Sequence, residues 1–351
     1  MQLGSCSQRR LIQEDVSPFK ASKRSLFALR MVLLFFAMTF GVYICSICLK
    51  QISTRITPQY VLLPKLEMTE RNCKIPDVPT EDLLYVHYPQ PKTYSRGECE
   101  CSPVRFFVIL SMQRSGSGWF ETLLNSHPNV SSNGEIFSVK ERRENFSTIE
   151  RTLDRVYNLE WVSSAAKNDC VAAVGFKWML NQAAMEYHRE IVKYFNRRGV
   201  LVIFLFRQNL LRRLISVLAN AYDREKKLLN GTHKSHVHSE KEAEVLAMYR
   251  PVINTANLLT NLKSVEKVME DSLRFFNSTR HILLYYEKLI NNQDLSAVQK
   301  FLGVPVRELK SRQVKIHTRP PSAQIDNWGD VHRTLRGTEY EHFLEHADHI
   351  T

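Results

Sequence analysis

The chain has 351 residues, 44% of them hydrophobic, and carries a formal net charge of +12. Its length and hydrophobic content allow one sizeable core and leave little for a second large domain. The basic balance suits an anionic ligand. The net charge alone does not exclude nucleic acid as a partner. The compartment that the N-terminal segment predicts does exclude it.

The N-terminal segment has the pattern of a membrane anchor. Residues 1–30 hold six Lys and Arg against two acidic residues, and Met31 to Leu49 form a 19-residue uncharged run that Lys50 closes. Such a run can cross a bilayer, and the basic residues before it place the N-terminus in the cytosol. A cleaved signal peptide is the competing interpretation, but the long leader and the absence of a small-residue cleavage site argue against it. We predict a type II protein with a cytosolic tail (1–30) and a signal anchor (31–49).

Features of the chain after the anchor agree with a luminal location of that part. Four sequons for N-glycosylation follow the anchor, at Asn129, Asn145, Asn230 and Asn277. Four of the seven cysteines are luminal as well, an even number in an oxidising space: Cys73, Cys99, Cys101 and Cys170. The Cys99-Glu-Cys101 spacing disfavours a bond within the triplet, so we expect pairing to Cys73 and Cys170, with the connectivity open. This compartment excludes nucleic acid as a partner.

The organisation beyond the anchor is a stem followed by one domain. Residues 50–103 contain seven prolines and little periodicity, which predicts a luminal stem with a poorly structured approach to the domain at 104–351. In that domain helices alternate with apolar strands at 104–110, 171–177, 200–207 and 281–286. The alternation predicts an α/β fold, with a mainly parallel sheet covered by helices on both faces. Ligands of such sheets bind at the carboxyl ends of the strands, where Arg114 and Arg207 lie.

The stretch from Phe106 to Trp119 (FFVILSMQRSGSGW) predicts an anion site. A buried strand breaks into a loop of small residues, and a helix opens after it. The helix N-terminus offers unpaired backbone N–H groups and a positive dipole end. Ser115 and Ser117 can add hydroxyl donors, and Arg114 adds a fixed charge. No Gly-Lys-Ser/Thr follows, so the usual magnesium-triphosphate site of nucleotide hydrolases is missing.

This loop resembles the phosphosulfate loop of sulfotransferases, in which Lys/Arg-Ser-Gly-Ser/Thr-Ser/Thr-Trp/Phe joins a strand to a helix. Gly118 departs from that pattern, because the position often carries a second hydroxyl. The resemblance implies that the loop binds 3′-phosphoadenosine 5′-phosphosulfate (PAPS) through Arg114, Ser115, Gly116, Ser117, Gly118 and Trp119.

A second segment resembles the 3′-phosphate motif of the same family. The strand Val200 to Phe206 ends at Arg207, and residues 209–227 are predicted as a helix that Asn209 caps. The resemblance implies that Arg207 and Ser216 bind the 3′-phosphate, although Gln208-Asn209 replaces the usual Asn-Pro. At least one of two further arginines is interpreted as lying on a solvated helix face: Arg212 or Arg213.

Two later segments extend the resemblance to about residues 104–335. The segment from His281 to Pro305 resembles a strand, Tyr-Glu-Asp/Lys-Leu and helix pattern, in which Glu287 is interpreted as a structural pairing group. In residues 315–330 a basic loop and a tryptophan are expected to close over the nucleotide, through Lys315, Arg319 and Trp328. The chain thus resembles Golgi-type carbohydrate sulfotransferases akin to bacterial nodulation-factor sulfotransferases. The resemblance implies a P-loop-like sulfotransferase fold, a Golgi membrane location, PAPS as co-substrate and a glycan acceptor.

Sulfuryl transfer needs a base, cationic groups and in-line geometry, but no metal. Glu135, in the segment SHPNVSSNGEIF, is the predicted base. His127 is the competing candidate, although its place before a proline at a helix end suggests capping. Lys177 ends a strand on the ligand side, where it could aid the leaving group, and a snorkelling surface lysine is the alternative. Arg114 is predicted to stabilise the negative charge of the transferred sulfuryl group.

Three histidines, His233, His236 and His238, look like a metal box, but no cysteine is near. We expect them to form an acceptor-side loop instead. Residues 241–276 are predicted as helical, with a break near Pro251, and as a wall of the acceptor cleft.

Two other functions fit parts of the pattern. A Golgi glycosyltransferase shares the type II layout, but the chain has no Asp-x-Asp triplet for manganese. A binding protein with an inactive sulfotransferase fold is compatible with Gly118 and the missing Asn-Pro. The sequence leaves the sugar, its hydroxyl position and the oligomeric state open.

Overall fold

The structure is a computed structural model that describes residues 23–56, 79–167, 169–290 and 295–345. The chain divides into two compact units, Met1–Asn72 and Cys73–Thr351. Parts of the predicted tail and stem, and Cys73, lie outside the described residues.

The first unit contains helix α1 (Lys23–Ile56), which includes the predicted anchor at 31–49. Among the residues that the structure describes, no helix combines the length and the apolarity needed to cross a membrane. The anchor and the compartment therefore stay predictions from the sequence.

The second unit is built on a five-stranded sheet in the order β2-β3-β1-β4-β5, in which every neighbouring pair is parallel. The strands are β1 (Arg105–Ser111), β2 (Val130–Ser132), β3 (Ala173–Met179), β4 (Val200–Phe206) and β5 (His281–Tyr285). Four of them confirm the predicted strands, and β2 is an addition. The register places Ile109 of β1 between Lys177 of β3 and Ile203 of β4. The carboxyl ends of these three strands therefore meet at one edge of the sheet.

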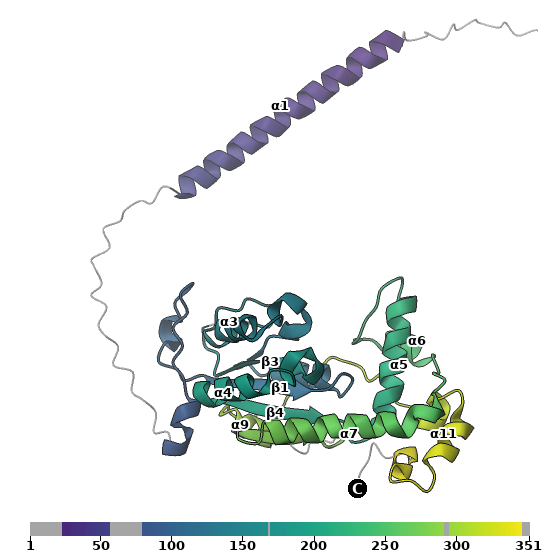
Figure 1. Cartoon of the computed structure of the whole chain (residues 1–351). Helices are drawn as coiled ribbons and strands as arrows, with labels where there is room; N and C mark the ends of the chain where they lie inside the picture. The colour runs from purple at the N-terminus through teal and green to yellow at the C-terminus, as the bar shows by residue number, and fades with distance from the viewer. Residues whose placement is uncertain (1–22, 57–78, 168, 291–294, 346–351) are drawn as a thin grey trace, which may run out of the picture. The chain divides into compact units, whose positions relative to one another are not determined.

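Helices cover both faces of this sheet, as predicted (Figure 1). Phe106, Val108 and Leu110 point to one face, where they pack with α3 (Phe146–Tyr157), α4 (His188–Arg198) and α7 (Leu258–Phe275). Phe107 and Ile109 point to the other, toward α2 (Ser117–Ser126) and α9 (Leu295–Phe301). Because alternate residues of a strand face opposite sides, a strand buried on both faces is apolar throughout.

A third apolar cluster lies beside the sheet. It joins α5 (Leu210–Lys226) and the start of α7 to α11 (Trp328–Leu335) and to Ile325, which follows the short helix α10 (Pro321–Gln324). The predicted helical stretch 241–276 is α6 (Glu240–Ala247) and α7, and the chain is non-helical around Pro251, as expected. The short helix α8 (Tyr286–Leu289) follows β5 directly.

Residues 79–103 differ from the expected loose stem, because they pack onto the domain. His87 forms an antiparallel bridge with Val104 and stacks on the Phe106 ring, with 4.0 Å between centroids. Asp82 pairs with Arg105 at 2.7 Å and also with Arg280. The hydrogen bond from Arg105, and then that from Arg280, lowers the pKa of Asp82. The folded unit therefore begins before residue 104.

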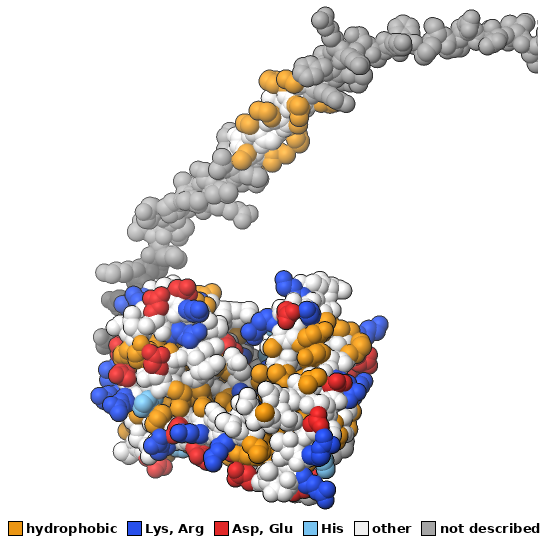
Figure 2. All heavy atoms as spheres, turned by 45° about the vertical axis from the view of Figure 1, so that its right-hand side comes forward, with side chains coloured by type: hydrophobic (Ala, Val, Ile, Leu, Met, Phe, Trp, Pro, Cys, Tyr) orange, Lys and Arg blue, Asp and Glu red, His pale blue; other side chains and the backbone are white. Residues whose placement is uncertain are grey.

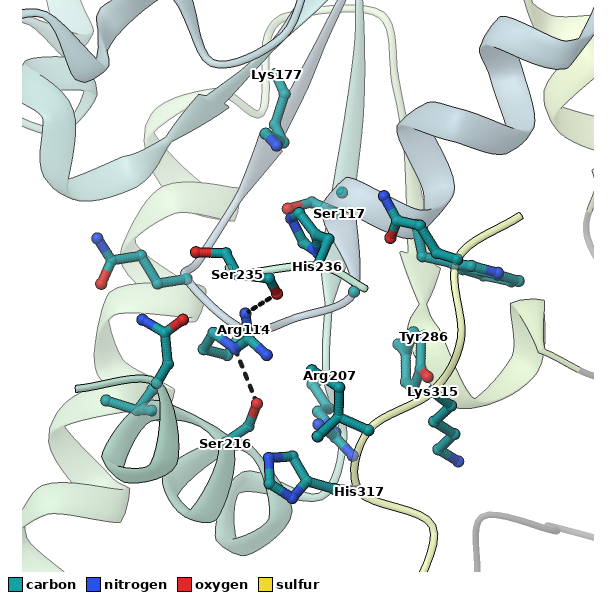
Figure 3. A pocket seen from close by; sticks show the side chains of 18 of the residues that line it. Arg114, Ser117, Lys177, Arg207, Ser216, Ser235, His236, Tyr286, Lys315 and His317 are labelled. Atoms are coloured by element: carbon teal, nitrogen blue, oxygen red, sulfur yellow. Dashed lines mark hydrogen bonds between the residues drawn. The ribbon is translucent and has the colours of Figure 1, made fainter. Parts of the chain in front are cut away.

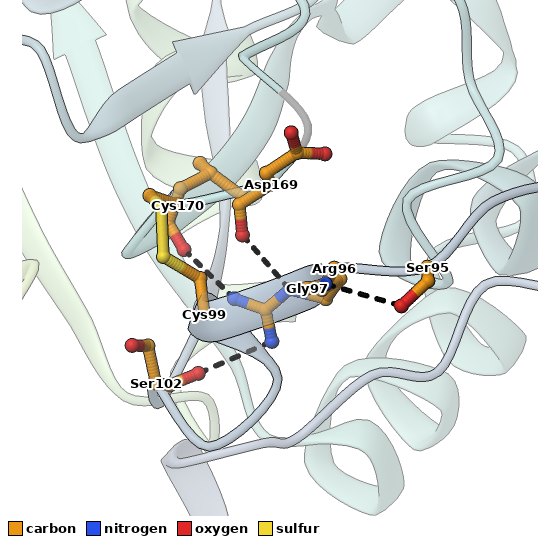
Figure 4. The surroundings of a disulfide bond; sticks show 8 residues. Ser95, Arg96, Gly97, Cys99, Ser102, Asp169 and Cys170 are labelled. Carbon is orange, nitrogen blue, oxygen red and sulfur yellow. Dashed lines mark hydrogen bonds between the residues drawn. A yellow bond between two sulfur atoms is a disulfide. The ribbon is translucent and has the colours of Figure 1, made fainter. Parts of the chain in front are cut away.

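A disulfide ties the same segment to the strand region (Figure 4). Cys99 is bonded to Cys170, one of the two expected partners, with Cα atoms 5.1 Å apart. Cys101 is disulfide-bonded as well. Beside the Cys99–Cys170 bond, Arg96 donates to the carbonyls of Asp169 (3.2 Å) and Ser102 (3.1 Å). Its charge is thereby satisfied by backbone oxygens of the two segments that the disulfide joins.

Candidate active site

The loop after β1 has the geometry that an anion site needs. Arg114 (φ 66°) and Gly116 (φ 80°) adopt left-handed backbone conformations, and Gly116 caps α2. A Cβ at Gly116 would overlap the Tyr286 ring, so the position has room for glycine only. The first helical bond runs from the Phe120 N–H to the Gly116 carbonyl at 3.0 Å. The N–H groups of residues 117–119 therefore lack an intrahelical partner at the positive end of α2.

A cavity of about 430 Å³ opens above this loop, at the carboxyl ends of β1, β3 and β4 (Figure 3). Arg114, Lys177 and Arg207 line it, each from a different strand end. Later segments contribute its other walls, through Ser216, Ser235, His236, Tyr286, Lys315 and His317. The space-filling view shows basic and acidic side chains interspersed over the visible face of this unit (Figure 2). On that face, no large patch of only basic or only acidic side chains is visible.

Arg114 joins the loop to two other segments. Its Nε donates to Ser216 Oγ at 2.8 Å, and its Nη1 donates to the Ser235 carbonyl at 2.8 Å. Desolvation, and then the Arg207 charge, lowers the pKa of Arg114 to about 10. The guanidinium therefore remains charged at neutral pH. The structure thus brings together Arg114, Ser216 and Ser235, which lie far apart in the sequence.

Arg207 is nearly buried and lies against an acidic partner. Its Nε is 3.7 Å from Glu287 Oε1, and its guanidinium is 5.2 Å from the centroid of the Tyr286 ring. Glu287 also accepts from the backbone N–H groups of Gln208 (3.0 Å) and Asn209 (3.2 Å). Glu287 thus holds the turn between β4 and α5, which confirms its structural role.

The expectation of a solvated face at Arg212 or Arg213 is wrong. Arg212 is 2% exposed and donates to the Arg319 carbonyl at 3.3 Å. Arg213 is half-buried, and desolvation followed by the Arg207 charge lowers its pKa to about 10. The first turn of α5 packs into the domain, so both guanidinium groups strengthen the positive potential around Arg207. His317 lies in the same field, where burial and then Arg114 lower its pKa to about 3.

Lys177 lies at the opposite end of the cavity, between two carboxylates. Its Nζ is 3.4 Å from Glu121 Oε2 and 3.8 Å from Glu135 Oε2. Lys177 is 7% exposed, so the alternative of a snorkelling surface lysine is wrong. Glu121, on α2, also accepts from Ser132 Oγ at 2.7 Å and from the Gly134 N–H at 2.8 Å. Sequence reasoning missed Glu121, although it lies one helical turn after Ser117.

Glu135 faces the cavity and its carboxylate stays accessible. Its side chain is 32% exposed, and it accepts from Gln182 Nε2. The competing base, His127, is buried at the end of α2 and does not line the cavity. Its Nε2 contacts the Pro305 carbonyl at 3.0 Å, and its Nδ1 accepts from the Asn129 N–H at 3.1 Å. Both ring nitrogens of His127 are therefore engaged by the backbone, away from the cavity.

The three loop histidines have separate surroundings. His233 contacts Asp223 at 2.5 Å, whereas His238 contacts the Arg312 carbonyl at 3.2 Å. His236 alone lines the cavity, where it packs on Gly118. Within the described ranges, no group of three His, Cys, Asp or Glu side chains is placed to hold a metal ion.

The remaining predicted residues divide between the cavity and its surroundings. Lys315 lines the cavity, with its Nζ 5.9 Å from the centroid of the Tyr286 ring. Arg319 is exposed, and Trp328 packs into the cluster of α5 and α11, so the structure brings neither to the cavity. Ser115 is buried within the loop and does not line the cavity. Tyr286, His236 and His317 line the cavity but are not among the predicted site residues.

The predicted glycosylation sites lie at the surface with one exception. Asn145, Asn230 and Asn277 are exposed. Asn129 is half-buried, and its carbonyl accepts from the N–H groups of Ala172 and Ala173.

The second unit thus combines a parallel α/β sheet with a cavity that Arg114, Lys177 and Arg207 line at the strand ends. No family model matches the chain. The chain is similar to nodulation protein H of Rhizobium meliloti, with 26% identity over 258 residues that cover 70% of this chain and 97% of that protein. Nodulation protein H of Rhizobium tropici is 25% identical over 254 residues, covering 69% and 94%.

Structural likenesses were also found among solved sulfotransferases. The sulfotransferase domain from the curacin biosynthetic pathway is 19% identical, with a TM-score of 0.32, over 62% of this chain and 81% of that chain. The sulfotransferase from Alicyclobacillus acidocaldarius is 13% identical, with a TM-score of 0.33, over 60% and 85%.

Proposed function

We propose that this protein is a sulfotransferase that moves a sulfuryl group from PAPS to a hydroxyl of a glycan acceptor. The observation that carries the proposal is the cavity that holds both Arg114, after β1, and Arg207, after β4, at the N-terminus of α2. Two separate cationic positions around one helix N-terminus suit a nucleotide with two separate anionic groups. The similarity to nodulation protein H agrees with the resemblance on which the motifs were interpreted.

Each end of the cavity has a role in binding the nucleotide. The N–H groups of residues 117–119 and Arg114 would hold the phosphosulfate. Arg207 and Ser216 would hold the 3′-phosphate, in the field of Arg213. The hydrogen bond between Arg114 and Ser216 links these two ends before any ligand binds, which lowers the ordering cost of binding.

The transfer step uses groups at the Lys177 end. The acceptor oxygen attacks sulfur, the bond from sulfur to the bridging phosphate oxygen breaks, and Glu135 takes the hydroxyl proton. Lys177 and Arg114 balance the charge that moves onto the leaving oxygen. Glu121 shares Lys177 with Glu135, and its hydrogen bonds to Ser132 and Gly134 fix the position of this pair.

Two departures from the family pattern are compatible with activity. Asn209 caps α5, because its side chain accepts from the Arg212 N–H at 2.9 Å, so the helix starts at its proper place without the Asn-Pro pair. At Gly118, the His236 ring fills the space of a side chain. Neither departure therefore counts against an enzyme.

The first test is calorimetric titration of the full chain with 3′,5′-adenosine bisphosphate, and with UDP plus manganese. We expect metal-independent binding of the bisphosphate that Arg207→Ala weakens at least tenfold. Arg197→Ala is the matched control, because Arg197 is exposed on α4 and pairs with Glu150. Binding of UDP in place of the bisphosphate would refute the proposal in favour of sugar transfer.

We also propose that residues 31–49 anchor the chain in the Golgi membrane with the second unit in the lumen. The exposed sequons and the Cys99–Cys170 bond support an oxidising, glycosylating compartment. We expect the second unit to be protected from added protease in sealed vesicles. We also expect glycans to be attached at Asn145, Asn230 and Asn277. Digestion of that unit in sealed vesicles would contradict it.

A further inference from the structure

The feature that the proposed function leaves unexplained is the pairing of Gly118 with His236. Gly118 is the second residue of α2, and a Cβ built on it would overlap the Nε2 and Cε1 atoms of His236. The imidazole therefore occupies the position that a side chain of residue 118 would take. Figure 3 shows His236 beside Ser117, between Arg114 and Lys177.

The loop that carries His236 is held on both sides. The Ser235 carbonyl accepts from Arg114 Nη1 at 2.8 Å, and the Val237 carbonyl accepts from the Val314 N–H at 2.9 Å. Val237 is buried between α6 and the 314–316 segment. With both neighbours held, the backbone that carries His236 is fixed against the domain.

The ring is available to a ligand. His236 is exposed through the cavity, and neither ring nitrogen has a hydrogen-bond partner among the described residues. Desolvation, followed by the Lys177 and Arg114 charges, lowers its pKa to about 4. At neutral pH the imidazole is therefore uncharged, with one N–H to donate and no carboxylate bound to it.

We propose that His236 is a sulfuryl-binding residue that donates a hydrogen bond to the transferred group from the place where residue 118 has no side chain. The inference rests on the proposed function. It follows from the location of the ring, because Arg114, Lys177 and the N–H groups at the start of α2 surround the same point. A specific donor on a loop between α5 and α6 thus completes a site whose other donors come from the sheet edge.

The test compares two nucleotides that differ by the sulfuryl group, PAPS and 3′,5′-adenosine bisphosphate, each titrated into the full chain. His236→Ala should raise the Kd of PAPS about tenfold or more, as expected for a hydrogen bond to a charged group, and change that of the bisphosphate less than twofold. His238→Ala is the matched control, because His238 lies on the same loop outside the cavity. Thermal unfolding of each variant reports whether it folds.

Two double variants separate donation from packing. In His236→Ala, Gly118→Ser restores a hydroxyl at the vacated place, whereas Gly118→Ala restores volume alone. Recovery of PAPS affinity with serine and not with alanine is expected. Equal recovery with both, or equal loss for both nucleotides in His236→Ala, would overturn the role of His236. If the wild type binds neither nucleotide, the proposed function itself fails.

Discussion

Arg114 Nε donates to Ser216 Oγ at 2.8 Å across 102 positions of sequence. The bond connects the loop after β1 to α5, and both partners line the same cavity. Ser216 therefore orients the guanidinium and also faces the cavity.

This contact predicts a graded loss of nucleotide affinity. Arg114→Ala should weaken binding of the bisphosphate about 100-fold, because a charge and two hydrogen bonds are removed, while Ser216→Ala should cost about tenfold. Calorimetric titration measures both. Losses that add up in the double variant would contradict the link between the two residues.

Arg207 should distinguish nucleotides by their 3′-phosphate. Arg207→Ala is expected to weaken the binding of 3′,5′-adenosine bisphosphate far more than the binding of adenosine 5′-phosphosulfate, which lacks the 3′-phosphate. Competition titration with the two ligands gives the ratio. An equal loss for both would remove Arg207 from the 3′-phosphate site.

Glu135→Gln should preserve nucleotide binding and lower turnover by about 10²–10⁴, the usual contribution of a general base. Turnover is measured as the rate at which 3′,5′-adenosine bisphosphate is released in the presence of acceptor glycans. Glu141→Gln, at an exposed position six residues later, serves as the control. Near-normal turnover in Glu135→Gln would show that the proton goes elsewhere.

The Lys177 cluster predicts an effect on stability. Lys177→Met leaves the Glu121 carboxylate buried without its cation, which should cost about 3–5 kcal/mol of the free energy of unfolding. Glu121→Gln should cost less, since the amide oxygen can still accept from Ser132. Denaturant unfolding compares the two variants, and a smaller loss for Lys177→Met than for Glu121→Gln would contradict the expectation.

His87 predicts a pH dependence of stability. Burial lowers its pKa from 6.5 to about 4, so the unfolded chain binds this proton at a higher pH than the folded chain. The contribution of His87 is therefore complete above pH 6.5 and is lost as the pH falls toward 4. His87→Phe should flatten the stability curve in that window. An unchanged curve would show that His87 is not the group that titrates.

The sheet was predictable because β1, β3 and β4 are buried on both faces and so form largely apolar runs in the sequence. The strand β2 was not predicted, because Val130–Ser132 has only three residues and two of them are polar. The loop after β1 was predictable from its glycine and serines at a strand end. What sequence reasoning could not give is the orientation of helices: Arg212 lies on the inner side of α5, and the half-buried Trp328 of α11 packs against the apolar cluster beside the sheet.

The Cys99–Cys170 bond and the packing of residues 79–103 bear on where an autonomous catalytic fragment can start. A fragment cut at residue 104 would lose the Asp82 partner of Arg105 and the cover over Phe106, and Cys170 would be left with a reactive thiol. A secreted fragment should therefore keep the segment from before residue 79, and it should be made by cells that oxidise thiols.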